Sequence, residues 1–573
     1  MKDIIATILI LWSVSAFSQG YTSQSVLADG DIYKISSDRA GIYKLSYSFL
    51  SDALNISLES VDPRNIRLFG NGNSMLPENI DEERIDDLKE IQIHVSGEED
   101  GRFDVQDYIL FYGQPADKRI WDSSRNIFSV ETNIYSDRVY YFLKIGDAPG
   151  QRIQTIEETG SPEYVSTGFD AFLKYEKEEI NLLNDFVSTS GTGQNWYGDL
   201  FKGIRQRDYS DKFIFPNLIS SDAGHVKVVF ASRSDATTAL KVKIEGQEFS
   251  RLIGSVDLSD PEGRYARIGI IEESFNAQGD NLNIQLDFPQ INGNSTGWLD
   301  LIEVNARRAI RYENQPLIFS DHHTQQFATS QIIIETLNPQ LKVWDISNPL
   351  QPISIITNHT QNRTSFNAST SLLRTFIAFN EDQSLTPVAL GQLPNQNLHG
   401  LDGINMLIVH PSNLEEQAQQ LANHRMLHSG ISVETIRIEE IFNEFASGSP
   451  DVTAIRDFAK MLYDRNEGFK YLLLFGDATF DFKNIAGLSP SLNLVPTYET
   501  RESLDPIRGF PTDDYFGLLT SGEGADLKGA LDIAIGRLPA KNEQEAIVLV
   551  NKIINYDTNP GYQDSWLNQL TFS

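Results

Sequence analysis

Cysteine is absent from all 573 residues of the chain. Disulfide bonds, thiolate metal sites and a cysteine nucleophile are therefore excluded for this sequence. Basic residues are also scarce, because 47 Lys and Arg stand against 79 Asp and Glu and give a formal net charge of −32. Nucleic-acid binding needs Lys and Arg that displace counterions from phosphates, so nucleic acid is not an expected partner. After the N-terminus, the sequence lacks any run of the ~18 apolar residues that a membrane-spanning helix requires.

The N-terminus has the pattern of a secretory signal peptide. Lys2 precedes an apolar stretch at residues 4–14, and the small residues Ala16 and Ser18 precede Gln19. This order of a basic, an apolar and a small-residue segment predicts cleavage after Ser18. We therefore assign residues 1–18 to a signal peptide and expect an exported protein that is soluble or peripherally held.

The remaining sequence divides by texture into three regions. Residues 19–161 and 162–387 hold short aromatic and β-branched runs between turn signals, which predicts two antiparallel β domains. From residue 388 apolar strands alternate with helical patterns, which predicts a doubly wound α/β domain with a parallel sheet. The sequence ends at Ser573 inside a predicted strand at residues 566–572, so we expect the α/β domain, residues 388–573, to be incomplete in this sequence. The expected fold class is thus multidomain.

The individual elements follow from hydrophobic spacing. Strands are expected at residues 32–35, 66–69, 91–95, 108–112 and 139–145, at 226–231, 240–244, 266–271, 282–288 and 299–306, and at 404–409, 431–438, 471–475 and 531–538. Helices are expected after a capping box at residues 412–415, around residues 452–462, and at residues 542–556 with Asn542 as the N-cap.

One stretch, residues 469–516, gathers the residues of greatest chemical interest. Its buried strand at residues 471–475 runs directly into Gly476 and Asp477. Ligands of open α/β sheets bind at the carboxyl ends of the strands, so carboxylates of this stretch are candidates for one acidic rim. The candidates are Asp477, Asp481, Glu499, Glu502, Asp513 and Asp514. The alternative is that Gly476 and Asp477 form only a turn and a helix cap.

Three other patterns have a functional and a structural interpretation. Asp100, Asp104 and Asp107 lie in a turn-rich loop that suits calcium, although the spacing is not that of an EF-hand and a solvated acidic loop is the alternative. The adjacent His322 and His323 point in different directions on any regular element, which disfavours a metal site. The segment at residues 191–198 carries two adjacent aromatic residues that could stack on a sugar or pack a seam between domains.

Five strings in the α/β region together resemble a known family. They are residues 443–448 (Asn-Glu-Phe-Ala-Ser-Gly), 451–458, 473–477, 511–517 (Pro-Thr-Asp-Asp-Tyr-Phe-Gly) and 535–539 (Ile-Gly-Arg-Leu-Pro). In this order they resemble the gingipain-type cysteine peptidases, a group that includes the sortase of the type IX secretion system. Residues 41–44, 107–112 and 196–198 extend the resemblance over essentially the whole mature chain. The resemblance implies a gingipain- or caspase-like α/β domain.

The resemblance also implies a catalytic chemistry. In the family a thiolate attacks the substrate carbonyl, an imidazole moves the proton, and a carboxylate orients the imidazole. The family's histidine and cysteine come from strand ends beyond the Ile-Gly-Arg segment, whereas this sequence has no cysteine and no histidine after His428. His399 and Gly400 form a His-Gly pair, but they precede the first strand of the domain and are predicted to lie in a loop.

Some residue roles can still be carried over by resemblance. Asp513, with Asp514 beside it, falls where the family lines the pocket for a basic substrate side chain, which a carboxylate binds through charge-assisted hydrogen bonds. Glu502, or else Glu499, falls near the carboxylate that orients the histidine. For Asp477 and Asp481 the expected role is to hold a turn or a structural calcium ion. No cofactor is required.

The implied function is that of an exported cysteine endopeptidase and sortase. It would cleave C-terminal sorting domains from secreted cargo proteins and transfer the cargo to a surface lipopolysaccharide, and its further partners would be an outer-membrane barrel or carrier protein of the secretion system. The implied location is the outer cell surface, peripherally attached to the outer membrane. The alternative is a catalytically silent docking or adhesion module, which the absence of cysteine favours.

Overall fold

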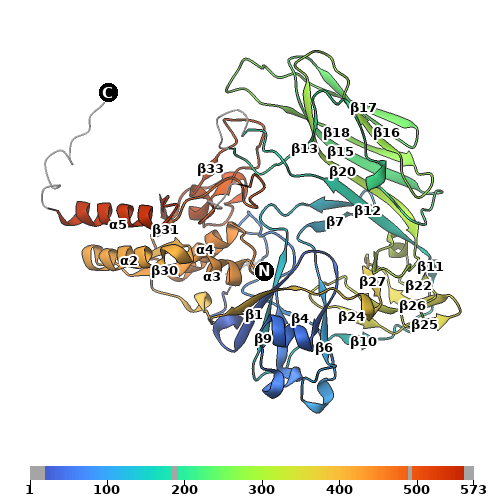
Figure 1. Cartoon of the computed structure of the whole chain (residues 1–573), viewed down its shortest axis with the longest axis horizontal. Helices are drawn as coiled ribbons and strands as arrows, with labels where there is room; N and C mark the ends of the chain where they lie inside the picture. The colour runs from blue at the N-terminus through green and yellow to red at the C-terminus, as the bar shows by residue number, and fades with distance from the viewer. Residues whose placement is uncertain (1–19, 184–190, 488–492, 560–573) are drawn as a thin grey trace, which may run out of the picture.

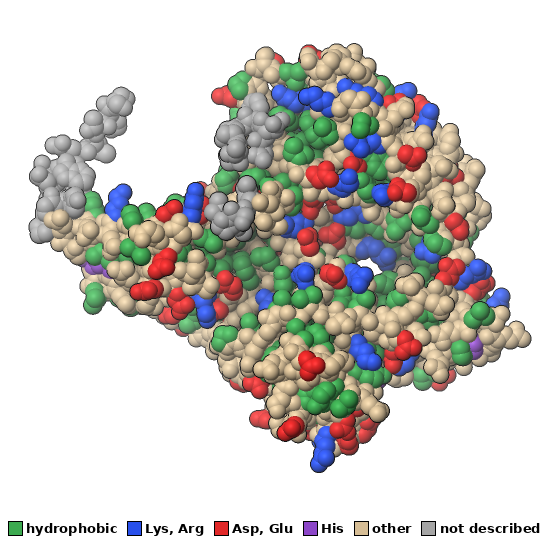
Figure 2. Space-filling model, in the orientation of Figure 1, with side chains coloured by type: hydrophobic (Ala, Val, Ile, Leu, Met, Phe, Trp, Pro, Cys, Tyr) green, Lys and Arg blue, Asp and Glu red, His purple; other side chains and the backbone are tan. Residues whose placement is uncertain are grey.

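The computed structural model describes residues 20–183, 191–487 and 493–559, so the predicted signal peptide and the predicted strand at residues 566–572 lie outside the described residues. Figure 1 shows a β unit near the N-terminus, two further β lobes and an α/β unit that carries the long helices. Acidic and basic side chains are interspersed on the face shown in Figure 2. Among the described helices, none combines the length and the apolar character needed to cross a membrane.

The N-terminal β unit contains a five-stranded and a three-stranded antiparallel sheet, with strand orders β28-β1-β9-β3-β4 and β2-β6-β5. The strands are β1 (Asp31–Ser37), β2 (Gly41–Ser46), β3 (Ile66–Phe69), β4 (Glu90–Ile91), β5 (His94–Ser96), β6 (Tyr108–Gly113), β9 (Val139–Ile145) and β28 (Val388–Leu393). Strand β28 pairs with β1 in the register Ile32 to Leu393, so the chain returns to this sheet just before the α/β unit. The predicted strand at residues 91–95 is split in two, and the buried Ile93 lies between β4 and β5.

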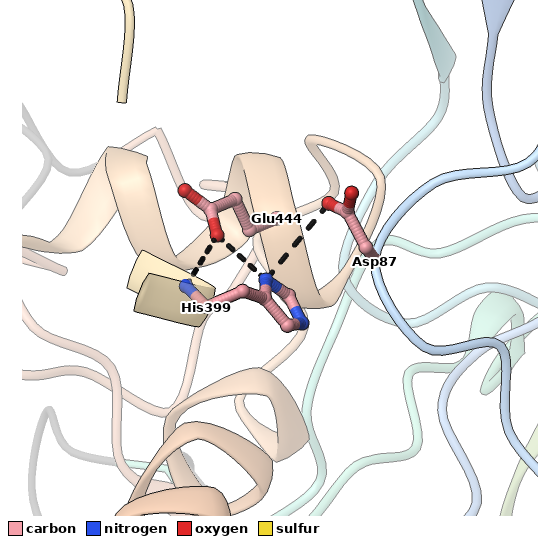
Figure 3. A group of neighbouring side chains, drawn as sticks. All are labelled: Asp87, His399 and Glu444. Atoms are coloured by element: carbon pink, nitrogen blue, oxygen red, sulfur yellow. Dashed lines mark hydrogen bonds and ion pairs between the residues drawn. The ribbon is translucent and has the colours of Figure 1, made fainter. Parts of the chain in front are cut away.

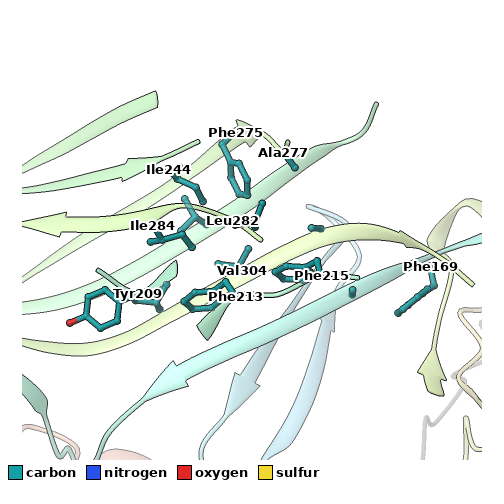
Figure 4. Close-up of a cluster of buried hydrophobic side chains, with 14 of the residues drawn as sticks. Phe169, Tyr209, Phe213, Phe215, Ile244, Phe275, Ala277, Leu282, Ile284 and Val304 are labelled. Carbon is teal, nitrogen blue, oxygen red and sulfur yellow. The ribbon is translucent and has the colours of Figure 1, made fainter. Parts of the chain in front are cut away.

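The first lobe of the second β region pairs two antiparallel sheets, with orders β12-β20-β15-β18 and β14-β19-β16-β17. Their strands are β12 (Gly168–Glu176), β14 (Gln206–Asp208), β15 (Ala223–Arg233), β16 (Thr238–Ile244), β17 (Gln247–Ile253), β18 (Arg267–Asn276), β19 (Ile284–Asp287) and β20 (Thr296–Ala309), with β13 (Gly198–Phe201) added beside β20. Every second residue of β16 is buried, as expected when one face of a sheet covers a core. Figure 4 shows part of this core, in which Phe213, Phe215 and Val304 lie between the strands.

The second lobe is built from chain segments on either side of the first. Its sheets have the orders β10-β24-β23-β27-β21 and β11-β22-β26-β25. The strands are β10 (Gln154–Ile156), β11 (Tyr164–Ser166), β21 (Leu317–Phe319), β22 (Thr329–Glu335), β23 (Lys342–Asp345), β24 (Ile353–Ile355), β25 (Asn358–Thr360), β26 (Arg363–Ser369) and β27 (Phe376–Phe379). Two pairings, β10 with β24 and β11 with β22, are parallel within an otherwise antiparallel region. A hairpin of β7 (Lys118–Asp122) and β8 (Ile127–Glu131) precedes both lobes.

The α/β unit has a fully parallel four-stranded sheet in the order β30-β29-β31-β34. Its elements are β29 (Met406–His410), α2 (Glu415–Ser429), β30 (Val433–Arg437), α3 (Ile438–Phe445), α4 (Thr453–Arg465), β31 (Tyr471–Phe475), β34 (Ala534–Leu538) and α5 (Glu543–Thr558). Within β29, Ile408 packs with α2 and α5, whereas Leu407 and Val409 pack with α3 and α4. Helices thus cover both faces, which explains why the central strands β29 and β31 are nearly continuous apolar runs.

The start of α2 differs from the prediction, whereas the start of α5 agrees with it. The predicted capping box forms a short 3-10 turn, η10 (Ser412–Leu414), and α2 begins after it with no side-chain cap. Asn542 does cap α5, because its Oδ1 accepts a hydrogen bond from the Glu545 N–H at 3.0 Å.

The loop between β3 and β4 joins the N-terminal β unit to the α/β unit, and we call residues 70–89 the docking loop. Its Leu76 N–H donates to Asp451 at 2.8 Å, and its Pro77 carbonyl accepts from Arg456 at 2.9 Å. Arg84 of the same loop pairs with Asp457 at 2.5 Å. The polar residues of the 451–458 string are therefore used for docking between units.

Candidate functional site

The candidate site lies beside the carboxyl ends of β31 and β34. Residues 476–533, which connect these two strands, contain a hairpin of β32 (Tyr498–Glu499) and β33 (Pro511–Thr512). Glu499 is the last residue of β32, and Asp513 directly follows β33. The hairpin therefore brings these two predicted carboxylates onto one small element.

Asp513 is held by an arginine of β34. The Arg537 guanidinium donates to both carboxylate oxygens of Asp513 at 2.7 Å, and the Thr497 hydroxyl adds a bond at 2.9 Å. Arg537 also donates to the Gly476 carbonyl at 2.8 Å and to the Val495 carbonyl at 2.6 Å. This arginine thus ties the end of β31 to the hairpin. The Asp513 side chain remains 23% exposed.

Glu499 is almost completely buried, with 1% exposure. One of its carboxylate oxygens accepts from the Thr192 hydroxyl at 2.9 Å and from the Gly193 N–H at 3.0 Å. Burial raises the pKa of Glu499 to about 7, against the opposing effect of these two hydrogen bonds. A carboxyl group with this pKa changes its charge near neutral pH, as acid–base and positioning groups of active sites do.

The partner loop of Glu499 comes from the second β region. Gly193 has φ +80°, and a Cβ atom there would lie 2.6 Å from the Glu502 carbonyl oxygen, so this loop position requires glycine. Trp196 is 7% exposed and stacks on Phe480 with ring centroids 5.6 Å apart. This tryptophan therefore packs the seam between the two regions, which is the structural one of its two predicted roles.

Glu502 faces the second β region as well. Its carboxylate pairs with Arg264 at 3.0 Å and accepts from the Leu504 N–H at 2.9 Å. The Tyr265 N–H donates to the Leu504 carbonyl at 2.7 Å. Glu502 is thus engaged in an ion pair between regions and is separated in its contacts from Glu499 and Asp513.

The remaining candidates hold the local backbone or face solvent. Asp481 is buried and accepts from the Ile485 and Ala486 N–H groups at 2.7 and 2.8 Å. Asp477 lies 3.8 Å from the Lys541 ammonium group, and its backbone bonds to Ala540, Leu494 and Val495. Asp514 is exposed. The six carboxylates therefore divide into separate contacts and do not form one rim.

A second cluster surrounds His399, which lies in the short 3-10 helix η9 (Leu398–Gly400) and is fully buried. Figure 3 shows its ring directed at Glu444 of α3, with Asp87 of the docking loop nearby. Nδ1 lies 2.7 Å from Glu444 and 3.9 Å from Asp87, and Nε2 lies 3.2 Å from Asp86. Burial by itself would lower the pKa of His399, but the hydrogen bonds to Asp86 and Glu444 raise it to about 9.

The His399 cluster binds a proton rather than offering an open metal site. Glu444 already accepts four hydrogen bonds, from Gln396, from the Leu398 and His399 N–H groups and from the ring. Asp87 accepts from Ser25 and Val26. With both ring nitrogens donating, His399 is a buried imidazolium between carboxylates of two units. The segment around His399, which was predicted to be a loop, therefore joins the α/β unit to the docking loop. Its partner Glu444 lies within residues 443–448, one of the five stretches that carry the family resemblance.

A guanidinium fills the other cluster of ligand-type side chains, Asp170, Asp321 and His322. Arg307 donates to Asp170 at 2.9 Å and to Asp321 at 2.7 Å. Within the part of the chain that the structure describes, neither the Asp100, Asp104 and Asp107 set nor the Asp477 and Asp481 pair belongs to a group of three close ligand side chains. Calcium at these positions stays a prediction.

Comparison with known proteins finds one family model that is similar to the C-terminal part of the chain. Residues 399–573 match the model of peptidase family C25. This match confirms the gingipain-type resemblance of the α/β region. The strings at residues 443–448, 451–458, 473–477, 511–517 and 535–539 all lie inside the matched segment.

The fold as a whole is similar to a solved structure, that of dimeric latent PorU from Porphyromonas gingivalis. The TM-score is 0.81 at 24% sequence identity, over 96% of this chain and 52% of that chain. The similarity confirms the predicted fold class, and the chain spans about half the length of that protein.

Two carbohydrate-binding modules also match parts of the chain, with TM-scores too low to support an argument. One is from the hindgut metagenome of Trinervitermes trinervoides (TM-score 0.14, 12% identity, 24% of this chain and 95% of that one). The other is from Cellvibrio japonicus (TM-score 0.15, 11% identity, 24% and 96%). No curated protein matches the sequence.

Proposed function

We propose that this chain is part of an exported C25-type cysteine endopeptidase that acts as a sortase. It would cleave C-terminal sorting domains from secreted cargo and transfer the cargo to an amine of a surface lipopolysaccharide. The proposed partners are the cargo proteins and an outer-membrane barrel or carrier protein, and the proposed location is the outer cell surface. The family match over residues 399–573, together with the position of Glu499 and Asp513 on one hairpin, carries the proposal.

The proposed reaction proceeds through a thioester. A thiolate attacks the scissile carbonyl carbon, and the amine of the sorting domain leaves with a proton from the imidazolium. An incoming amine then attacks the thioester, forms the new amide and returns the thiolate, while the imidazole takes up the proton. These 573 residues hold no cysteine, so the proposal places the thiolate in polypeptide outside them.

Glu499 is the better candidate for the carboxylate that orients the imidazole. Glu502 is already paired with Arg264, whereas Glu499 is buried and, within the described residues, lies in no ion pair. Because burial raises the pKa of Glu499 to about 7, an approaching imidazolium would stabilise the ionised carboxylate and draw both groups into a pair.

Asp513 is proposed to bind the basic side chain before the cut. Its partly exposed carboxylate can share a second guanidinium beside Arg537 or exchange partners with it. A role restricted to anchoring Arg537 is the competing interpretation, because the two oxygens already accept three hydrogen bonds.

The test uses the longest protein that the gene encodes and compares peptides with Arg, Lys or Gln before the cut. Asp513→Asn should lower kcat/KM about 10- to 100-fold for the Arg and Lys peptides and only a few-fold for the Gln peptide. Asp514→Asn, the exposed neighbour, is the matched control, and thermal melting checks that each variant folds. An equal loss for all three peptides would show that Asp513 only anchors Arg537. A folded protein with no thiol-dependent turnover of any peptide would instead support the docking module.

A further inference from the structure

A large pocket lies at the junction between the second β region and the hairpin of the α/β unit. Its volume is about 770 Å³, within the usual range of ligand sites, and junctions between domains are favoured places for them. Arg264 and Ile268 line it from the β side, and nine of the residues between 498 and 510 line it from the hairpin side. The pocket does not include Asp513, so it is separate from the proposed site for the basic side chain.

The side chains that line this pocket include more arginines than carboxylates, unlike the chain as a whole. Three arginines, Arg264, Arg501 and Arg508, line it against the two carboxylates of Glu502 and Asp526, in a chain of net charge −32. Guanidinium groups match carboxylates in planar, bidentate geometry. An anionic group is therefore the expected ligand chemistry.

The arginines differ in whether they are already paired. Arg264 is paired with Glu502 at 3.0 Å and with Asp505 at 3.6 Å, and Arg501 is paired with Glu78 of the docking loop at 3.1 Å. Arg508 is exposed, and within the described residues no carboxylate lies within 4.0 Å of its guanidinium. Its guanidinium is free to meet a ligand.

Apolar groups stand beside these charges. Ile507, Phe510 and Ile268 are 64%, 43% and 40% exposed, and all three line the pocket, so they gather apolar surface at one place. The Tyr197 hydroxyl is buried at the same place and makes no hydrogen bond of acceptable geometry within the described residues. A ligand that offers apolar side chains and acceptor oxygens together would satisfy both features.

We propose that this pocket binds an acidic peptide segment in which carboxylate and bulky apolar side chains alternate. The carboxylates would meet Arg508 and Arg501, and the apolar side chains would cover Ile507 and Phe510. The choice of a polypeptide rests on the proposed function, since a peptidase presents its clefts to extended chains. The pocket would hold a part of the substrate other than the basic side chain at the cut.

The test is a binding measurement that requires no catalysis. The probe is a fluorescein-labelled peptide, Gly-Asp-Phe-Asp-Leu-Gly, titrated with the folded chain by fluorescence anisotropy, against the same peptide with Asn in place of Asp. We expect Kd for the Asn peptide to be about tenfold higher or more, and affinity for the Asp peptide to fall with added salt.

Three variants localise the binding. Arg508→Gln should raise Kd about tenfold, because it removes a charge-assisted hydrogen bond to the peptide but, among the described residues, breaks no ion pair. Tyr197→Phe should raise Kd a few-fold. Arg102→Gln, at an exposed arginine that does not line the pocket, should leave Kd within about twofold.

Several outcomes would overturn the proposal. Equal affinity for the Asp and Asn peptides would remove the anionic specificity, and an unchanged Kd in Arg508→Gln would remove the location. Two other results would show another class of ligand. One is complete displacement of the peptide by inorganic phosphate together with no contribution of the peptide's apolar side chains to affinity. The other is binding of the protein to anionic lipid vesicles but not to the peptide. Because binding is read without turnover, a failure here is distinguishable from a failure of the peptidase assignment.

Discussion

At the scale of single residues, the acidic side chains beside β31 and β34 differ mainly in what neutralises them. Asp513 has the Arg537 guanidinium, and Glu502 has Arg264. Glu499 is buried with a hydroxyl and a backbone N–H as its partners, and within the described residues no Lys, Arg or His pairs with it. Ionising a buried carboxyl group that has no cation beside it costs free energy, so the protonated form is favoured.

This difference predicts the effect of Glu499→Gln on stability. Unfolded, Glu499 ionises near its ordinary pKa of 4.5, whereas burial holds the folded pKa at about 7. The folded state therefore binds the proton more tightly than the unfolded state. The contribution of Glu499 to the free energy of unfolding is fully present below about pH 4.5 and is lost as the pH rises through about 7. The Gln variant keeps the acceptor oxygen without the charge. It should be more stable than the parent above pH ~7, by roughly 2–3 kcal/mol, and nearly equal to it at pH ~4.5.

Urea unfolding of both proteins across this pH range measures the difference. Glu543→Gln, at the exposed first position of α5, is the control and should leave the pH dependence unchanged. A parallel course of the parent and Gln curves from pH ~4.5 to ~8 would refute the raised pKa of Glu499.

At the scale of elements, the parallel sheet was the easiest part to predict. Strand β31 has the predicted bounds, because a strand covered on both faces is one unbroken apolar run between polar ends. Helix α3 was not predicted, although Ile438, Ile441 and Phe445 repeat at helical spacing, because it follows β30 with no turn residue between them. The capping box predicted at residues 412–415 did not form, since residues 412–414 make a 3-10 turn and α2 begins only at Glu415.

The sequence predicted where the candidate carboxylates lie, but not which residues contact them. The end of β31 located the carboxylates near the sheet edge by a general property of α/β folds. The groups that decide their chemistry, such as Thr192 for Glu499 and Arg264 for Glu502, lie 307 and 238 positions away in the sequence. No local pattern encodes such contacts, because they depend on how the β region docks.

The buried His399 shows how a 3-10 helix, α3 and the docking loop are held together. As an imidazolium it donates to Glu444 and to Asp86. Because the folded pKa is about 9 and the ordinary value is 6.5, its contribution is full below about pH 6.5 and is lost as pH rises through about 9. His399→Gln should therefore destabilise the protein by about 3 kcal/mol near pH 6 and by much less near pH 10.

Guanidinium unfolding at these two pH values measures the effect. His428→Gln, on the exposed side of α2, is the control for a histidine outside the cluster and should change stability by less than about 0.5 kcal/mol. The same loss for His399→Gln at both pH values would mean that packing on Phe445, and not the proton, is what His399 contributes.

At the scale of the whole molecule, the α/β unit is joined to the N-terminal β unit by groups drawn from the motif strings. Lys34 of β1 donates to Asn443 at 2.8 Å, and the Asn71 N–H donates to Ser447 at 3.0 Å. Together with the contacts of Asp451 and Arg456 to the docking loop, these hydrogen bonds join buried or half-buried polar groups across the interface. Such a polar interface favours one specific arrangement of the two units, because a buried polar group left without a hydrogen-bond partner destabilises the fold.

Arg456 is the residue on which this junction most depends. It is fully buried on α4, donates to the Pro77 and Glu78 carbonyls, and lies over the Tyr515 ring at 4.8 Å. Arg456→Met would fill much of the volume but leave two buried carbonyls unpaired, at a cost of roughly 3–5 kcal/mol. Because that cost falls on the interface, we expect calorimetry to resolve a separate, earlier transition of the α/β unit. Lys460→Met, one turn along α4, should keep the parent profile. If Arg456→Met instead lowers one unsplit transition, the two units form a single cooperative body, and the docking loop stabilises the whole chain rather than a junction.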